Sequence, residues 1–109
     1  MRVRRSREFR RVLSRGARGT DHLLTLWLLP NGLDVPRLGL IVGRRQGGAV
    51  RRNRLKRLLR EAFRLSQRRL LIGYDYVCAP RAGVKLRLDA CMESLLRLGT
   101  RLSARFREH

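Results

Sequence analysis

The stretch from Gly47 to Arg68 constrains the fold most, because it combines a helical apolar repeat with a dense run of basic residues. Its apolar residues recur at i, i+3, i+4, i+7 and i+8, the spacing of one helical face: Leu55, Leu58, Leu59, Ala62 and Phe63. At about 100° per residue, the opposite side is cationic, with Arg54 and Lys56 on its flanks and these residues at its centre: Asn53, Arg57, Arg60, Arg64 and Arg68. The sequence therefore predicts an amphipathic helix that packs one face on a core and presents a basic face.

The charge of the whole chain indicates what kind of partner such a face would meet. In 109 residues, 27 Lys and Arg oppose 8 Asp and Glu, giving a formal net charge of +19. This density favours a polyanionic partner, above all nucleic acid, whose phosphate contacts release counterions. A solvated basic face without a partner would not explain so strong a field. A membrane is disfavoured, because no apolar run approaches the roughly 18 residues of a spanning helix and no apolar signal segment follows the basic N-terminus.

The length predicts a single domain over residues 1–109, large enough for a modest core without disulfides. Residues 1–5 are expected to form a mobile basic arm. Cys78 and Cys91 form no C-x-x-C pair and are interpreted as reduced, buried thiols, which favours a cytoplasmic location.

The remaining elements follow from capping, turn and apolar patterns. A helix over residues 7–15 follows the N-cap Ser6 and ends at Gly16, and residues 17–21 are expected to be a linker. Residues 22–29 and 37–43 are predicted strands, most simply an antiparallel hairpin around the turn-rich segment 30–36. A third strand over 74–79 would lie parallel to the second across the central helix, and a last helix begins near Leu86 or Leu88. The prediction is an α+β sandwich in the order α-β-β-α-β-α, with a small mixed sheet and a βαβ crossover.

The sequence offers no catalytic group of its own. His22 and His109 lack a nucleophile or metal-ligand context. Asp89 and Glu93 lie at i, i+4 and could share Mg²⁺, but acidic residues early in a helix are better explained by the helix dipole. Glu61 is expected to moderate repulsion through contact with Arg57. No catalytic and no metal-binding residues are predicted.

Nucleic-acid binding suits the residues that are present. Arginine offers a planar fork of donors that matches phosphate and stacks on bases, and Asn53 can meet a base edge or a 2′-hydroxyl. The segment Arg44–Gly48 is a basic, glycine-rich loop at a helix start, but it matches neither the Walker pattern nor G-x-G-x-x-G. Trp27 lies on a strand whose two faces are equally apolar, so spacing alone favours the core without excluding a stacking platform.

A longer pattern is carried by residues 44–64. The run RRQGGAVRRNRLKRLLREAFR resembles the signature of the bacterial ribonuclease P protein subunit, K-K-x-G-N-A-V-x-R-N-R-x-K-R-x-x-R-x-x-F. The likeness covers most of the chain, with E-F-x-x-V-L-x-x-G at 8–16, R-x-G-L-x-V at 37–42 and Y-D-Y-V at 74–77.

The resemblance implies the fold derived above with a left-handed crossover, although the general rule for such crossovers is right-handed. It implies a subunit, monomeric within a ribonucleoprotein endoribonuclease, that binds a catalytic RNA and the 5′ leader of precursor tRNA. The RNA and Mg²⁺ held by RNA and substrate would carry the hydrolysis. By position, the catalytic RNA would contact Arg44, Arg45, Arg52, Asn53, Arg54, Lys56, Arg57 and Arg60. The leader cleft would include Phe9, Leu13 and Trp27, which favours stacking for the tryptophan.

Two positions depart from the family pattern. Gly48 replaces the usual Asn, which removes a helix cap or an RNA contact, and Leu13 replaces what is often Phe, which removes a stacking surface. Two other functions stay open: a structural RNA-binding protein such as a ribosomal protein, and a DNA-binding protein. The DNA alternative is disfavoured, because the basic helix is wedged between two strands and no dimerisation element is evident.

Overall fold

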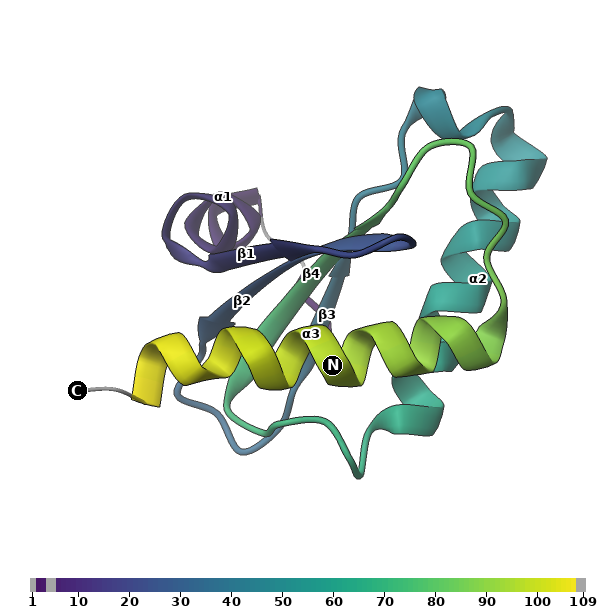
Figure 1. Cartoon of the computed structure of the whole chain (residues 1–109). Coiled ribbons are helices and arrows are strands. Elements are labelled where there is room, and N and C mark those ends of the chain that lie inside the picture. Colours follow the sequence, from purple (N-terminus) through teal and green to yellow (C-terminus); the bar gives the residue numbers. More distant parts are fainter. Residues whose placement is uncertain (1, 4–5, 108–109) are drawn as a thin grey trace.

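The computed structural model describes residues 2–3 and 6–107. It forms a four-stranded sheet with helices on both faces (Figure 1). In chain order the elements are α1 (Ser6–Arg15), β1 (Ala17–Thr20), β2 (Leu24–Pro30), β3 (Arg37–Leu40), the short 3-10 turn η1 (Arg44–Gln46), α2 (Ala49–Ser66), β4 (Tyr74–Pro80) and α3 (Leu88–Arg107). The predicted α+β order is confirmed, with one short strand, β1, added to it.

The strands lie in the order β1-β2-β4-β3, with β4 antiparallel to β2 and parallel to β3. The predicted mixed sheet and the parallel pair around α2 are therefore confirmed. The predicted hairpin between the second and third strands is wrong, because β4 lies between them. Every residue of β4 is buried or half-buried, so this strand needs hydrogen-bonding partners on both of its edges.

The partner of β2 on its other edge is the segment that was expected to be a linker. β1 pairs with β2 antiparallel from Ala17↔Leu28 to Thr20↔Thr25. Asp21 fixes the turn between them, because its Oδ1 accepts the backbone N–H of Leu23 at 2.8 Å and of Leu24 at 2.9 Å. The polar sequence of β1 gave no strand signal, and its pairing comes from this turn.

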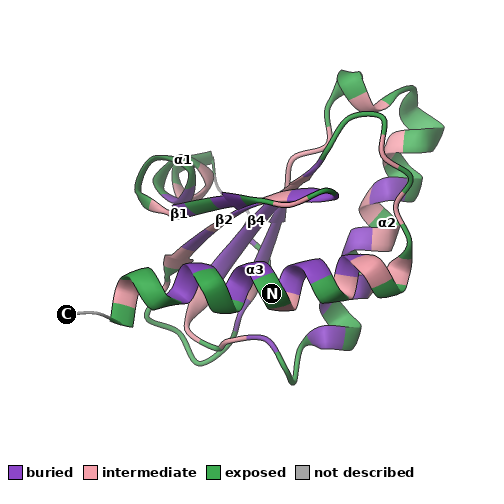
Figure 2. Cartoon of the chain, viewed as in Figure 1, coloured by how far each residue is buried: buried purple, intermediate pink, exposed green. Residues whose placement is uncertain are grey.

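The two faces of the sheet are covered differently (Figure 2). Along β2, Leu24, Leu26 and Leu28 are fully buried in the core shared with α2 and α3. The alternate side chains, including Trp27, are half-buried on the other face, where Val12 of α1 packs against Val77 of β4. This alternation settles the question that the sequence left open: Trp27 faces α1 and lies outside the main core.

The apolar face predicted for the central helix is confirmed. Leu55, Leu59, Ala62 and Phe63 are buried, and Leu58 is half-buried against the same core.

The contact of α3 with the sheet depends on a glycine. Gly99 faces the fully buried Tyr76, and a Cβ atom at Gly99 would lie 3.0 Å from the Tyr76 ring. The Tyr76 hydroxyl accepts the Leu71 N–H at 3.0 Å, which fixes the ring. The residue that weakens the helix locally therefore permits its close approach to the sheet.

Part of the N-terminal arm is bound to the sheet. The backbone N–H of Val3 donates to the carbonyl of Leu38 at 3.0 Å, Arg2 forms a parallel bridge with Leu38, and Val3 is buried. The arm predicted to be mobile thus has fixed contacts at these two residues, whereas Met1, Arg4 and Arg5 lie outside the described residues. The apolar Val3 gives this contact a hydrophobic cause.

Candidate nucleic-acid interface

The start of α2 is set by two glycines and tied to the sheet. Gly47 has φ +117°, a conformation that favours glycine, and Gly48 is the N-cap without any side-chain cap hydrogen bond. Whether the family's Asn at this position would cap the helix or contact RNA stays open. Arg51 Nε donates to the Gln46 carbonyl at 2.7 Å, and Gln46 Nε2 donates to the Pro80 carbonyl at 2.7 Å. These bonds link the first turn of α2 to the end of β4.

The basic residues predicted to meet the catalytic RNA differ in exposure and in the cavities that they line. Those that are exposed are Arg44, Arg45, Asn53, Arg54, Arg57 and Arg60, whereas Arg52 and Lys56 are half-buried. Arg54 and Arg57 line a cavity on one side of α2, next to residues 83–86. Lys56 and Arg60 line another cavity on the side of β3. Arg44 and Arg45 lie in η1, just before the helix.

The cavity beside β3 has a volume of ≈ 180 Å³ and brings together residues from both predicted sites. Phe9, predicted to meet the leader, lines it with Lys56 and Arg60, predicted to meet the catalytic RNA. Arg60 also lines a neighbouring hollow with Arg64. The structure thus places the aromatic residue of α1 next to the cationic side of α2.

The predicted leader residues lie on the α1 side of the sheet but differ in exposure. The Phe9 ring covers Gly39, where a Cβ atom would approach within 2.8 Å of the ring. Trp27 packs in the same apolar cluster, and the Arg18 guanidinium carbon lies 5.7 Å from its ring centroid. Leu13 is 39% exposed. Phe9 and Trp27 therefore share one half-buried apolar surface, with Leu13 at the exposed side of α1.

The charge of α2 is only weakly compensated. Glu61 forms an ion pair with Arg64, so the contact predicted with Arg57 is wrong; the i, i+3 spacing brings the carboxylate to Arg64 instead. The hydrogen bond from Arg64 lowers the pKa of Glu61. Among residues 2–3 and 6–107, no carboxylate lies within ion-pair distance of Arg54, Arg57 or Arg60. Their charges are therefore available to an external anion.

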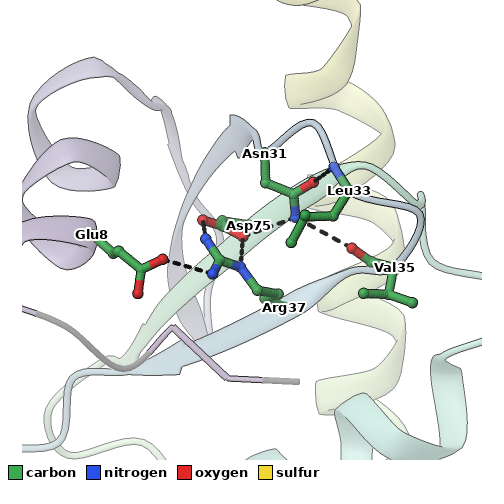
Figure 3. Close-up of polar contacts among 6 residues, drawn as sticks. All are labelled: Glu8, Asn31, Leu33, Val35, Arg37 and Asp75. Carbon is green, nitrogen blue, oxygen red and sulfur yellow. Dashed lines mark hydrogen bonds and ion pairs between the residues drawn. The ribbon is translucent and has the colours of Figure 1, made fainter.

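A network of charged side chains holds α1 on the sheet (Figure 3). Arg37 of β3 donates through Nε and Nη2 to both carboxylate oxygens of Asp75, each at 2.7 Å, and through Nη1 to Glu8 of α1 at 2.7 Å. Asn31 Nδ2 adds a bond to Asp75 at 2.9 Å. The hydrogen bonds that Arg37 donates, first to Asp75 and then to Glu8, raise its pKa, although burial opposes this. Glu8 precedes Phe9, so the network also positions that ring.

The acidic residues of the described part of the chain do not gather into a metal centre. Asp89 lies 3.7 Å from the Arg87 guanidinium, and both Asp89 and Glu93 are exposed. Among the described residues, no three His, Cys, Asp or Glu side chains come together. That part of the chain thus shows no protein cage that would fit Mg²⁺. No helix in the described part of the chain is long and apolar enough to cross a membrane.

Several residues of these surfaces were not among the site residues predicted from the sequence. Arg2 and Arg64 join Arg60 beside β3, Arg51 and Lys85 line the cavity on the other side of α2, and Arg18 covers Trp27. Arg51 and Arg64 lie in the basic run and could have been included on that signal. Lys85 and Arg18 carry no local pattern, because only tertiary packing brings them to these places.

Comparison with known proteins agrees with this architecture. Residues 1–103 match the family described as Ribonuclease P. The ribonuclease P protein component of Natranaerobius thermophilus is 35% identical over 97 residues, covering 88% of this chain and 84% of the relative. The ribonuclease P protein component of Caldanaerobacter subterraneus subsp. tengcongensis is 40% identical over 82 residues, covering 75% of this chain and 71% of the relative.

A solved structure of the ribonuclease P protein from Thermotoga maritima superposes with a TM-score of 0.83 at 33% identity, covering 93% of this chain and 96% of that one. The family match and the structural likeness each cover most of the chain. The chain therefore belongs to the family of ribonuclease P protein components.

Proposed function

We propose that this protein binds the catalytic RNA of ribonuclease P and the 5′ leader of precursor tRNA, and so assists removal of the leader. In this proposal the RNA and its Mg²⁺ carry out the hydrolysis, and the protein binds and positions the two RNAs in the cytoplasm. The observation that carries the proposal is α2, an 18-residue helix with exposed, uncompensated arginines, in a chain of this family.

The electrostatics of α2 support binding to the catalytic RNA. Arg54, Arg57 and Arg60 lie over two turns and have no carboxylate partner among the described residues. Guanidinium groups match phosphate oxygens bidentately, and their binding is favoured by release of counterions. The helix is anchored by its buried apolar face, so these side chains are presented on a rigid element.

The α1 side of the sheet supports binding of a single strand. Trp27 and Phe9 are half-buried aromatic residues in one apolar cluster, and Arg18 lies over the tryptophan ring. Aromatic rings beside cationic groups are typical of surfaces on which unpaired bases stack. The leader of precursor tRNA is the single strand that the family function offers.

Reconstitution tests the proposal. Adding the protein to a bacterial ribonuclease P RNA at near-physiological Mg²⁺ should raise the rate of precursor tRNA cleavage above that of RNA alone. Absence of any gain would refute the proposal and favour a structural RNA-binding protein. The protein without RNA should cleave nothing, and metal-dependent cleavage by the RNA-free protein would overturn the assignment of catalysis to RNA.

Substitutions separate the two surfaces. Arg54→Ala should weaken binding of the catalytic RNA and reduce the salt slope by about one unit for each phosphate that is no longer bound. Arg105→Ala, on the exposed side of α3, is the matched control for the removal of one charge. Trp27→Leu keeps an apolar side chain but removes the ring. If a base stacks on Trp27, the substitution should weaken binding of precursor tRNA roughly tenfold relative to binding of mature tRNA. Equal effects on the two tRNAs would assign Trp27 to packing alone.

A further inference from the structure

A large hollow lies between α2 and the segment that connects β4 to α3. Its volume is ≈ 670 Å³, within the roughly 300–1,000 Å³ of small-molecule sites. Figure 1 shows this connecting segment running alongside α2. The two walls come from positions about 30 residues apart, which is why the sequence pattern did not reveal the cavity.

The lining combines an apolar surface with a cationic rim. Leucines from both walls contribute the apolar part, Leu55 and Leu58 from α2 and Leu86 from the connecting segment. Three arginines of α2 and one lysine of the segment contribute the charge: Arg51, Arg54, Arg57 and Lys85. Among the described residues, no acidic side chain lines the cavity. Such a lining matches a ligand that joins an apolar, planar group to an anion.

The α2 wall is held in place independently of any ligand. Leu55 is buried in the core, and Arg51 is fixed by its bond to the Gln46 carbonyl. At the rim, Gly83 has φ +77° and a Cβ atom there would meet nothing within 4 Å, so the turn leaves the mouth open. The other three cationic groups of the lining make no ion pair within the described part of the chain. The α2 side of the cavity is thus fixed, and these three charges are available to an anion.

We propose that this cavity receives one unpaired nucleotide of the partner RNA, with its base against the leucines and its phosphate on the basic rim. Inorganic phosphate would leave the apolar wall unused, whereas an arginine beside a base can both stack and bind the phosphate. The proposal rests on the proposed function for the source of the nucleotide, but its chemistry stands on the lining. In this proposal α2 contacts an unpaired base of the RNA as well as phosphates.

Titration with small probes tests the site without any catalytic RNA. Leucine methyl NMR signals are followed while adenosine 5′-monophosphate, ribose 5-phosphate or inorganic phosphate is added. The nucleotide should bind about tenfold tighter than ribose 5-phosphate, because stacking adds to the phosphate contact. It should shift the methyl signals of Leu55, Leu58 and Leu86. Equal affinity of the two organic phosphates, or shifts confined to other leucines, would overturn the proposal.

A pair of tryptophan substitutions extends the test to the whole RNA. Leu86→Trp fills the cavity and should weaken binding of ribonuclease P RNA about tenfold, because it excludes the base although every basic group of the rim is kept. Leu65→Trp is the matched control, since Leu65 is an exposed leucine of α2 outside the cavity, and it should bind normally. Equal losses in both variants would count against the cavity. Lys85→Gln changes an exposed side chain and provides a test even if Leu86→Trp folds poorly. It should weaken the binding of adenosine 5′-monophosphate and of ribose 5-phosphate to the same degree.

The two proposals fail separately. Preferential binding of the nucleotide without any gain in reconstituted cleavage would keep the cavity and reject the proposed function. A gain in cleavage together with equal binding of the two organic phosphates would keep the proposed function and reject the cavity as a nucleotide site.

Discussion

Removal of the Asp75 carboxylate is the sharpest test of how α1 is held on the sheet. Asp75 accepts two hydrogen bonds from Arg37, and their side chains are only 5% and 15% exposed. Asp75→Asn keeps the shape but leaves the Arg37 guanidinium with Glu8 as its remaining charged partner among the described residues. The substitution therefore isolates the charge of one buried carboxylate.

The expected cost follows from burial. Removing one partner of a buried pair costs about 3–5 kcal/mol, whereas exposed pairs contribute about 0–1 kcal/mol. Because Arg37 keeps some solvent access and a second carboxylate, we expect Asp75→Asn to lower the free energy of unfolding by about 3 kcal/mol. The Glu8 side chain is 26% exposed, so its ion pair with Arg37 is less buried than that of Asp75, and Glu8→Gln should cost only about 1 kcal/mol.

Urea denaturation followed by circular dichroism is the appropriate assay, because guanidinium would screen the charges of this basic protein. Asp34→Asn is the control, since Asp34 is exposed and should change stability by less than about 0.5 kcal/mol. If Asp75→Asn costs no more than Asp34→Asn, the network is not a stabilising element and the reasoning is refuted. The double variant Glu8→Gln/Asp75→Asn should lose less free energy of unfolding than the sum of the two single losses. Such a result would show that Glu8, Arg37 and Asp75 act together.

Three further outcomes are expected. Gly99→Ala should destabilise by about 1 kcal/mol, because overpacking against the fixed tyrosine ring outweighs the gain in helix propensity; urea unfolding that shows a stabilised variant would contradict this packing. At Asp21 burial alone would raise the pKa, but hydrogen bonds from backbone N–H groups and Arg97 lower it from 3.8 to about 2. The stability lost in Asp21→Asn should therefore be constant above about pH 4 and shrink as the pH falls toward 2, as unfolding across that range would measure; a pH-independent difference would exclude the charge. Burial raises the pKa of the Cys78 and Cys91 thiols to about 12 and about 11, so iodoacetamide at pH 8 should label them only in urea, and rapid native labelling would contradict their burial.

The parts of the fold that the sequence predicted are those with a strong local period. The apolar face of α2 carries a repeat that burial later matched, and the strand at residues 74–80 was predicted from a short, largely apolar run between turn residues. β1 was missed because its sequence is short and polar, and its pairing depends on the turn at Asp21. The strand order was partly wrong because adjacency in a sheet is decided by burial of the whole strand, which local spacing does not contain.

In the candidate site, too, features within one element could be predicted, whereas features that depend on packing between elements could not. The exposed arginines of α2 could be predicted from helical geometry and from the family pattern, because both act within one element. The sequence could not predict that Phe9 lies near Lys56 and Arg60, or that Lys85 lies beside α2. These groupings arise from the packing of separate elements. The position of Trp27 was ambiguous because β2 is apolar on both faces, and the structure resolved it through α1.

The central place of β4 also dictates when the molecule can fold during synthesis. β2 and β3 have no common neighbour until residues 74–80 have left the ribosome, and their pairings close loops of more than 30 residues. Non-local pairing of this kind is slow and comes late. The nascent chain must therefore carry its arginine-rich helix, without a sheet to dock on, past the polyanionic surface of the ribosome before the native structure can close.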